Sequence, residues 1–256
     1  MDLFDYMREN TMETESPLAS RLRPRTLDEV VGQQHIVGVD KLLYRAIKAD
    51  KLGSIIFYGP PGTGKTLAAT LLGKKNRMDV YRIDLSMIVS KYIGETEKNL
   101  ARVFDLAENR NWILFFDEAD ALFGKRTSTN TSNDRHANQE VAYLLQRIED
   151  FPGIIILATN LRSNIDEAFS RRFQSVVYFP MPTPELRAEL WRKMLPTRWL
   201  GGEADEMVAL AAETELSGGS ITNVVRRCAL YMVKSKEKML NKRILKETLQ
   251  KEKLKN

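Results

Sequence analysis

The chain has 256 residues and a formal net charge of +5, from 39 lysines and arginines against 34 aspartates and glutamates. A charge of this size does not by itself indicate a nucleic-acid partner. The single cysteine, Cys228, excludes an internal disulfide, and the two histidines, His35 and His136, lie too far apart for a histidine-rich metal site. No apolar run approaches the roughly 20 residues of a membrane helix. We therefore expect a cytoplasmic protein that makes no membrane contact.

The first 16 residues are polar, show no periodicity and lack the basic and apolar regions of a secretory signal, so we expect a frayed leader over 1–16. Short apolar segments without clean polar alternation then recur, as is typical of strands covered on both faces. The predicted strands are Ser54–Tyr58, Val80–Asp84, Trp112–Glu118, Ile154–Asn160 and Ser175–Phe179.

Helical periodicity fills the intervals between these strands, at Lys65–Lys75, Glu95–Asn109 and Ala137–Glu149. Strands that alternate with helices of this length predict an α/β fold, in which a parallel sheet has helices on both sides. The prolines of the segment PMPTP, at 180–184, interrupt the pattern. Beyond them the sequence is helical, at Glu185–Met194, Ala204–Thr214, Ile221–Ser235 and Lys242–Lys253. We expect a three-layer αβα domain over 17–181 and a small helical domain over 182–256.

A glycine-rich segment, GPPGTGKT at Gly59–Thr66, follows the first strand and opens a helix. This is the context in which G-x-x-x-x-G-K-[ST] forms a phosphate-binding loop. Its backbone N–H groups point at phosphate oxygens, Lys65 supplies a cation, and the Thr66 hydroxyl is a ligand for Mg²⁺. The candidate residues for binding ATP are Gly59, Pro60, Pro61, Gly62, Thr63, Gly64, Lys65, Thr66 and Leu67.

Two acidic residues, Asp117 and Glu118, end the apolar strand of ILFFDEAD. A carboxylate beside a buried strand needs a cation, and Asp117 near a phosphate loop is a candidate ligand for Mg²⁺. Glu118 is then a candidate general base for water attack on the γ phosphate. Asn160, at the end of the next strand, could orient that water or merely cap a turn.

These motifs together resemble the AAA+ ATPases, and residues 71–196 resemble the AAA clade in particular. GPPGTGKT is similar to Walker A, ILFFDE to Walker B and Asn160 to sensor 1. The resemblance implies a P-loop NTPase domain with a helical lid, assembled into a ring, usually a hexamer, with ATP between neighbouring subunits. The segment 164–173 resembles the region that carries arginine fingers. It makes Arg171 and Arg172 both candidates, with pairing to acids on their own subunit as the alternative.

Three further segments resemble parts of this superfamily. KYIGETEKN, at 91–99, is similar to a pore loop that grips polypeptide, with Tyr92 and Ile93 projecting; burial before a helix is the alternative. LSGGSITNVVRR, at 216–227, is similar to the sensor-2 segment, with Ile221 at the nucleotide-facing position. The N-terminal residues, from SPLASRLRPRTLDEVVGQQHIVG at 16–38 to the phosphate loop, resemble bacterial replication-associated recombination ATPases, relatives of clamp loaders. This resemblance implies that VVGQ, at 30–33, places Val31 and Gly32 against adenine.

The sequence therefore predicts a Mg²⁺-dependent ATPase that forms a ring and moves a macromolecule, with polypeptide favoured over DNA as the substrate. One alternative is a DNA-dependent replication or recombination ATPase, which the N-terminal resemblance favours. The other is an assembly switch that binds ATP and hardly turns it over.

Overall fold

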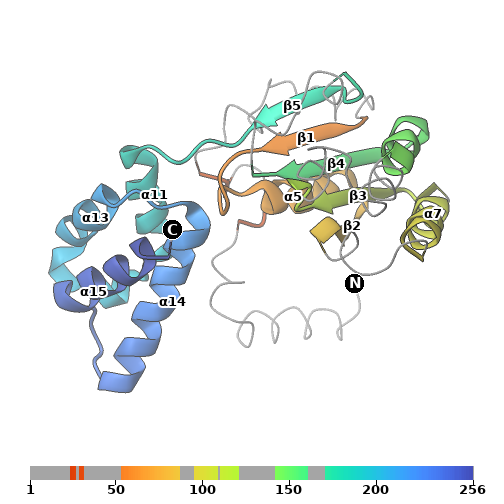
Figure 1. Ribbon diagram of the computed structural model, residues 1–256. Helices are drawn as coiled ribbons and strands as arrows, with labels where there is room; N and C mark the ends of the chain where they lie inside the picture. The colour runs from red at the N-terminus through yellow and green to blue at the C-terminus, as the bar shows by residue number, and fades with distance from the viewer. Residues whose placement is uncertain are drawn as a thin grey trace, which may run out of the picture. The chain divides into compact units, whose positions relative to one another are not determined.

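The computed structural model describes residues 24–26, 29–31, 53–86, 95–108, 110–120, 142–160 and 171–255 (Figure 1). Two compact units make up the chain. Among the described residues, the unit that we call the sheet unit contains residue 26 and those from 53 to 180. The helical unit contains residues 24–25, 29–31 and 181–255.

Five parallel strands form the sheet of the sheet unit, in the order β2-β3-β4-β1-β5. Their bounds are β1 Ile55–Tyr58, β2 Asp79–Asp84, β3 Trp112–Asp117, β4 Ile154–Thr159 and β5 Ser175–Tyr178. The predicted parallel α/β sheet is confirmed. Because every strand runs the same way, the carboxyl ends of β1, β3 and β4 share one edge of the sheet.

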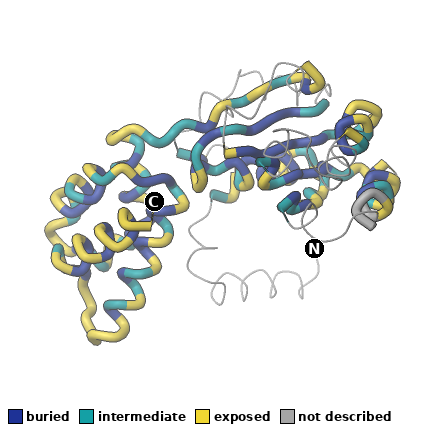
Figure 2. The backbone as a smooth tube through the Cα atoms, in the orientation of Figure 1, coloured by how far each residue is buried: buried dark blue, intermediate teal, exposed yellow. Residues whose placement is uncertain are grey.

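The two faces of the sheet are covered by different helices. On one face, Ile56, Phe116 and Leu157 pack with apolar residues of α7 (Glu95–Glu108) and of the helical residues 142–150. On the other face, β2, β3 and β4 contact α5 (Lys65–Asn76), whose Ala68, Ala69, Leu71 and Leu72 are buried. Figure 2 shows the strands of the sheet's centre as predominantly buried backbone. The layers are therefore helix, sheet and helix.

The expectation that every strand is covered on both faces is wrong for the two edge strands, β2 and β5. β1, β3 and β4 are almost entirely buried, as predicted, because each has a strand on both sides. β2 and β5 lie at the sheet edges and expose several side chains, among them Tyr81, Val176 and Tyr178. An edge strand with one neighbour is not covered as a central strand is.

The helical unit is built from α11 (Pro184–Met194), α12 (Thr197–Leu200), a 3₁₀ turn at Gly201–Glu203, α13 (Ala204–Glu213), α14 (Gly218–Ser235) and α15 (Lys242–Lys253). Pro184 takes the first helical position of α11, and the Thr183 hydroxyl accepts a hydrogen bond from Leu186 N, so the predicted break is also a helix start. Ser217 caps α14, which begins three residues before the predicted Ile221. The core of the unit includes Trp191, Ile221 and Cys228.

Some predictions fall outside the described residues: the leader over 1–16, the start of the third helix at 137–141, and the pore-loop residues Tyr92 and Ile93. Among the helices that the structure describes, none combines the length and apolar character needed to cross a bilayer.

Candidate nucleotide-binding site

The loop between β1 and α5 depends on glycine at particular positions. Gly59, Gly62 and Gly64 have φ of 144°, 76° and 104°, which other residues rarely adopt. At Gly59 a Cβ atom would lie 2.2 Å from the carbonyl oxygen of Phe179, so any side chain there would displace the backbone after β5. α5 begins at Lys65 with no side-chain cap and no acidic residue in its first turn. The loop therefore presents the N–H groups of a helix start without a competing carboxylate, an arrangement suited to an anion.

Lys65 is buried in the loop, with 8% of its surface exposed. Its Nζ donates to Gly59 O at 2.5 Å, to Pro60 O at 3.0 Å and to Asn160 Oδ1 at 3.1 Å. Burial lowers the pKa of Lys65 from 10.5 to about 8, and the negative charges of Asp117 and Asp120 oppose that shift. A phosphate group near Nζ would further favour the charged ammonium.

Asp117 lies at the carboxyl end of β3, with its side chain 13% exposed. Its Oδ1 accepts a hydrogen bond from Glu118 N at 3.0 Å. Its Oδ2 accepts one from Thr66 Oγ1 at 3.4 Å and lies 2.8 Å from the Arg82 guanidinium. A hydroxyl and a carboxylate oxygen side by side fit the ligand preferences of Mg²⁺, which takes its other ligands from phosphate and water. Thr66 and Asp117 are therefore the residues that could hold the metal.

Glu118 follows Asp117 in the left-handed region, with φ of 53°. A non-glycine residue held there is strained by about 1–2 kcal/mol, and such strain concentrates at functional sites. Two neighbouring hydrogen bonds fix this backbone, from Glu118 N to Asp117 Oδ1 and from Ala119 N to Ala158 O at 2.9 Å. Glu118 is exposed to solvent. The position suits a carboxylate that meets a bound ligand rather than the protein core.

Asp120 is a site residue that the sequence reasoning missed. Its carboxylate accepts hydrogen bonds from Thr159 Oγ1, from Asn160 N at 3.1 Å and from Asn160 Nδ2 at 3.1 Å. With Nδ2 held in this way, Asn160 turns Oδ1 towards Lys65. The signal was present in ILFFDEAD, whose third acidic residue lies just beyond Glu118. Asp120 therefore fixes the orientation of the amide.

The two candidate finger residues, Arg171 and Arg172, are both exposed. Arg172 Nε lies 2.6 Å from Glu149 Oε1, so it pairs with an acid on its own subunit, as the alternative interpretation allows. Both partners keep about two fifths of their surface in solvent, at 41% and 42%. Such a pair contributes little stability and leaves the guanidinium able to exchange partners.

The other predicted residues are distributed as follows. Pro61 and Gly62 are exposed in the loop, and Leu67 is half-buried in the first turn of α5. Val31 is half-buried and belongs to the helical unit, while Gly32 lies outside the described residues. Ile221 is fully buried in the core of the helical unit, where it packs among apolar residues.

Comparison with known proteins gives a consistent result. Residues 55–181 match the family model described as "ATPase family associated with various cellular activities (AAA)". Vacuolar protein sorting-associated protein 4B of Pongo abelii is 34% identical over 185 residues, which are 70% of this chain and 42% of that protein. The proteasome-activating nucleotidase of Methanocella arvoryzae is 30% identical over 200 residues, 75% of this chain and 48% of that protein. The chain thus spans about half the length of the curated relatives it matches.

A solved structure agrees at the level of the fold. The crystal structure of the FIGL-1 AAA domain has a TM-score of 0.63 and 22% sequence identity, and the match covers 80% of this chain and 76% of that one. The five-stranded parallel sheet and its glycine-rich loop lie within the matched family region. The chain therefore contains an AAA-family ATPase domain at residues 55–181.

Proposed function

We propose that the protein hydrolyses ATP with the help of Mg²⁺, and that the carboxyl edge of the sheet is the active site. The observation that carries the proposal is that Lys65 and Thr66 open α5 next to the carboxyl ends of β3 and β4, where Lys65 donates a hydrogen bond to Asn160 and Thr66 donates one to Asp117. The first test is phosphate release by the purified chain with ATP and Mg²⁺. A chain that binds ATP and releases no phosphate would favour the assembly switch.

The roles follow from charge and position. Lys65 and the N–H groups of the loop would bind the β and γ phosphates. Thr66 and Asp117 would hold Mg²⁺, which offsets phosphate charge when bound. Glu118 would accept a proton from the attacking water, and Asn160, oriented by Asp120, would position that water near the γ phosphate. The proposal that Val31 and Gly32 contact adenine rests on the sequence resemblance alone. Ile221, also predicted to face the nucleotide, is fully buried in the core of its own unit and has no exposed surface to offer a ligand.

For the larger activity, we propose a homo-oligomeric ring, of hexameric type, that acts on polypeptide in the cytoplasm. The support comes from the relatives, since one is named a proteasome-activating nucleotidase and another a vacuolar protein sorting-associated protein. The pore-loop proposal for Tyr92 and Ile93 rests on the sequence alone. A DNA-dependent ATPase is the second candidate, because the N-terminal residues up to the phosphate loop resemble recombination ATPases.

The two substrate classes can be separated by one comparison. An unfolded polypeptide is expected to stimulate ATP hydrolysis several-fold, and the Tyr92→Ala variant should lose this stimulation while keeping basal hydrolysis, because the aromatic ring supplies the grip. Forked or single-stranded DNA should have no effect at low salt. Stimulation by DNA that disappears as salt rises would contradict the polypeptide proposal and support the DNA-dependent one.

An arginine finger acts from the neighbouring subunit and contributes on the order of 10³–10⁵ in rate. A double variant, Arg171→Ala with Arg172→Ala, should therefore be inactive alone and partly active when mixed with Lys65→Ala subunits. In the mixture, an intact phosphate loop meets intact arginines at some interfaces. Repeating the mixture with each single variant assigns the finger.

Glu149→Gln is the matched control for this experiment, because it removes only the partner of Arg172 within the subunit. This control should hydrolyse ATP at the wild-type rate. No recovery of activity in verified mixed assemblies would contradict a role for either arginine across the interface.

A further inference from the structure

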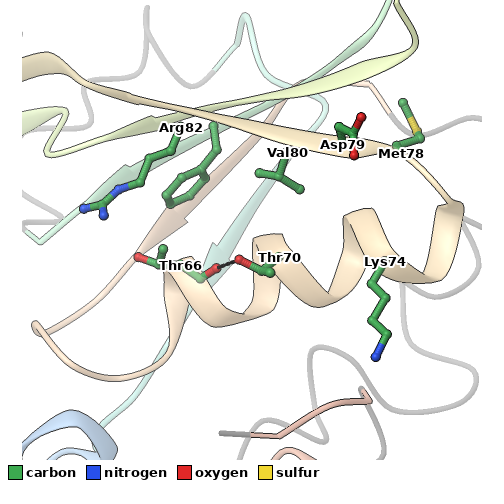
Figure 3. Close-up of a pocket in the computed structure, with 8 residues that line it drawn as sticks. Thr66, Thr70, Lys74, Met78, Asp79, Val80 and Arg82 are labelled. Carbon is green, nitrogen blue, oxygen red and sulfur yellow. Dashed lines mark hydrogen bonds between the residues drawn. The ribbon is translucent and has the colours of Figure 1, made fainter. Parts of the chain in front are cut away.

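Arg82 is a basic residue of β2 whose guanidinium reaches the proposed metal ligand. The parallel register pairs Arg82 with Phe115 and Asp84 with Asp117, so these side chains share the face of the sheet that α5 covers. Figure 3 shows Arg82 extending from β2 towards the first turn of α5, where Thr66 lies. The guanidinium ends 2.8 Å from Asp117 Oδ2. Arg82 thus forms an ion pair with the carboxylate proposed to hold Mg²⁺.

The contact uses the same oxygen that a metal would need. Asp117 Oδ1 is already engaged by Glu118 N, while Oδ2 accepts from Thr66 Oγ1, the other proposed metal ligand. A cation bound between Thr66 and Asp117 therefore competes with Arg82 for Oδ2. Two positive charges at one carboxylate oxygen repel each other, so the binding of each disfavours the other.

The surroundings of Arg82 leave room for its side chain to move away from Asp117. A cavity of about 390 Å³ lies beside it, lined by Thr66, Thr70, Lys74, Met78, Asp79, Val80, Arg82 and Phe115. The side chain of Arg82 is 56% exposed, so it can leave Asp117 and stay hydrated. Asp84 of β2, the register partner of Asp117, lies on the same face of the sheet. Its Oδ1 accepts hydrogen bonds from Ser86 N at 3.0 Å and from Ser86 Oγ at 2.6 Å.

From these contacts we infer that Arg82 is an internal counter-ion of Asp117 in the nucleotide-free protein, displaced from Oδ2 when Mg²⁺ binds with nucleotide. The inference rests on the proposed function and adds a residue that tunes its dependence on the metal. Arg82 stabilises the empty site by neutralising a carboxylate that is mostly shielded from water. The same contact weakens metal binding, which must first break it.

The test measures nucleotide affinity, not catalysis. Binding of a fluorescent ADP analogue is titrated once in excess Mg²⁺ and once in EDTA. The Kd in EDTA divided by the Kd in Mg²⁺ gives the contribution of the metal, and a higher ratio means that the metal contributes more. Replacing Arg82 by Ala or Gln should raise this ratio roughly three- to tenfold, the size expected for a partly exposed charge-assisted pair. Arg82→Lys keeps the charge and should give an intermediate ratio.

Arg102→Ala is the matched control, since Arg102 is an exposed arginine of α7 in the same unit. It removes one positive charge from α7, which packs on the opposite face of the sheet from α5 and the Asp117 side chain, and should leave the ratio at the wild-type value. Circular dichroism of each variant checks the fold, and the Gln variant serves if the Ala variant is unstable.

The outcomes are distinct. A ratio unchanged in both Arg82→Ala and Arg82→Gln overturns the inference and leaves the proposed function standing. A lower ratio also overturns it, because Arg82 would then support metal binding by orienting Asp117. Wild-type protein that binds no nucleotide in either buffer overturns the proposed function and this inference together.

Discussion

The Lys65→Ala variant is expected to bind ATP and ADP at least 10²-fold more weakly than the wild type. Lys65 is the proposed cation for the phosphates, and losing charge-assisted hydrogen bonds to phosphate costs about 1.5–3 kcal/mol each. Equilibrium binding of a fluorescent nucleotide measures the change. The substitution also frees Gly59 O, Pro60 O and Asn160 Oδ1 from their common donor, so circular dichroism should accompany the titration.

The lowered pKa of Lys65 also predicts how nucleotide affinity depends on pH. Because the ammonium loses its proton from about pH 8 in the nucleotide-free protein, and phosphate favours the charged form, binding above that pH must take up a proton. Nucleotide affinity should therefore be flat from about pH 7 to pH 8 and should fall as pH rises further. Calorimetry at about pH 8.5 in two buffers of different ionisation enthalpy measures the uptake directly.

Arg102→Ala is again the control for the loss of one positive charge, and it should leave nucleotide affinity unchanged. Wild-type affinity in Lys65→Ala would contradict the assignment of the phosphate site. Affinity that does not change up to about pH 9.5 would contradict only the titration of Lys65 in that range.

The Glu118→Gln variant is expected to bind ATP as the wild type does and to hydrolyse it roughly 10²–10⁴-fold more slowly, the usual contribution of a general base. Glutamine has the shape of glutamate, and the backbone at φ of 53° is held by Asp117 Oδ1 and by the bond from Ala119 N to Ala158 O. The change therefore removes a proton acceptor with little effect on structure. Steady-state phosphate release and nucleotide binding, measured on the same preparation, separate the two effects.

Glu213→Gln, at the end of α13, is the matched substitution at an exposed glutamate of the helical unit. It should leave turnover unchanged. Wild-type turnover in Glu118→Gln would remove Glu118 from the mechanism. An equal loss in both variants would point to a general effect of losing a negative charge.

The fold was accessible from the sequence because the apolar runs are short and bounded by glycine, proline and acidic residues. Each predicted strand agrees with the observed one to within a single residue at either end. The sheet order was not accessible, and with it the exposure of β2 and β5, because hydrophobicity along a strand does not say which strand lies beside it. The short α12 was missed because it is a single turn of four residues.

For the site, the sequence predicted the residues that motif spacing determines, and the structure brings Lys65 into contact with Asn160 and Thr66 into contact with Asp117. It missed Asp120 and Arg82, which act on those residues through side-chain contacts. Asp120 is recognisable only when the ends of β3 and β4 are known to be adjacent. Arg82 requires the register of β2 against β3, which places its side chain on the α5 face.

The tight approach of Gly59 to Phe179 links the loop to the end of the sheet unit. Phe179 N donates to Tyr58 O at 2.8 Å, and the rings of Phe57 and Phe179 lie 4.9 Å apart, so two further contacts join Phe179 to the residues just before Gly59. Pro180, the next residue, is the last of the sheet unit. If Gly59 moves towards Phe179 by more than this close approach allows, the backbone of Phe179 has to move with it. A movement of the phosphate loop is therefore passed directly to the residue that precedes Pro180, where the sheet unit ends and the helical unit begins.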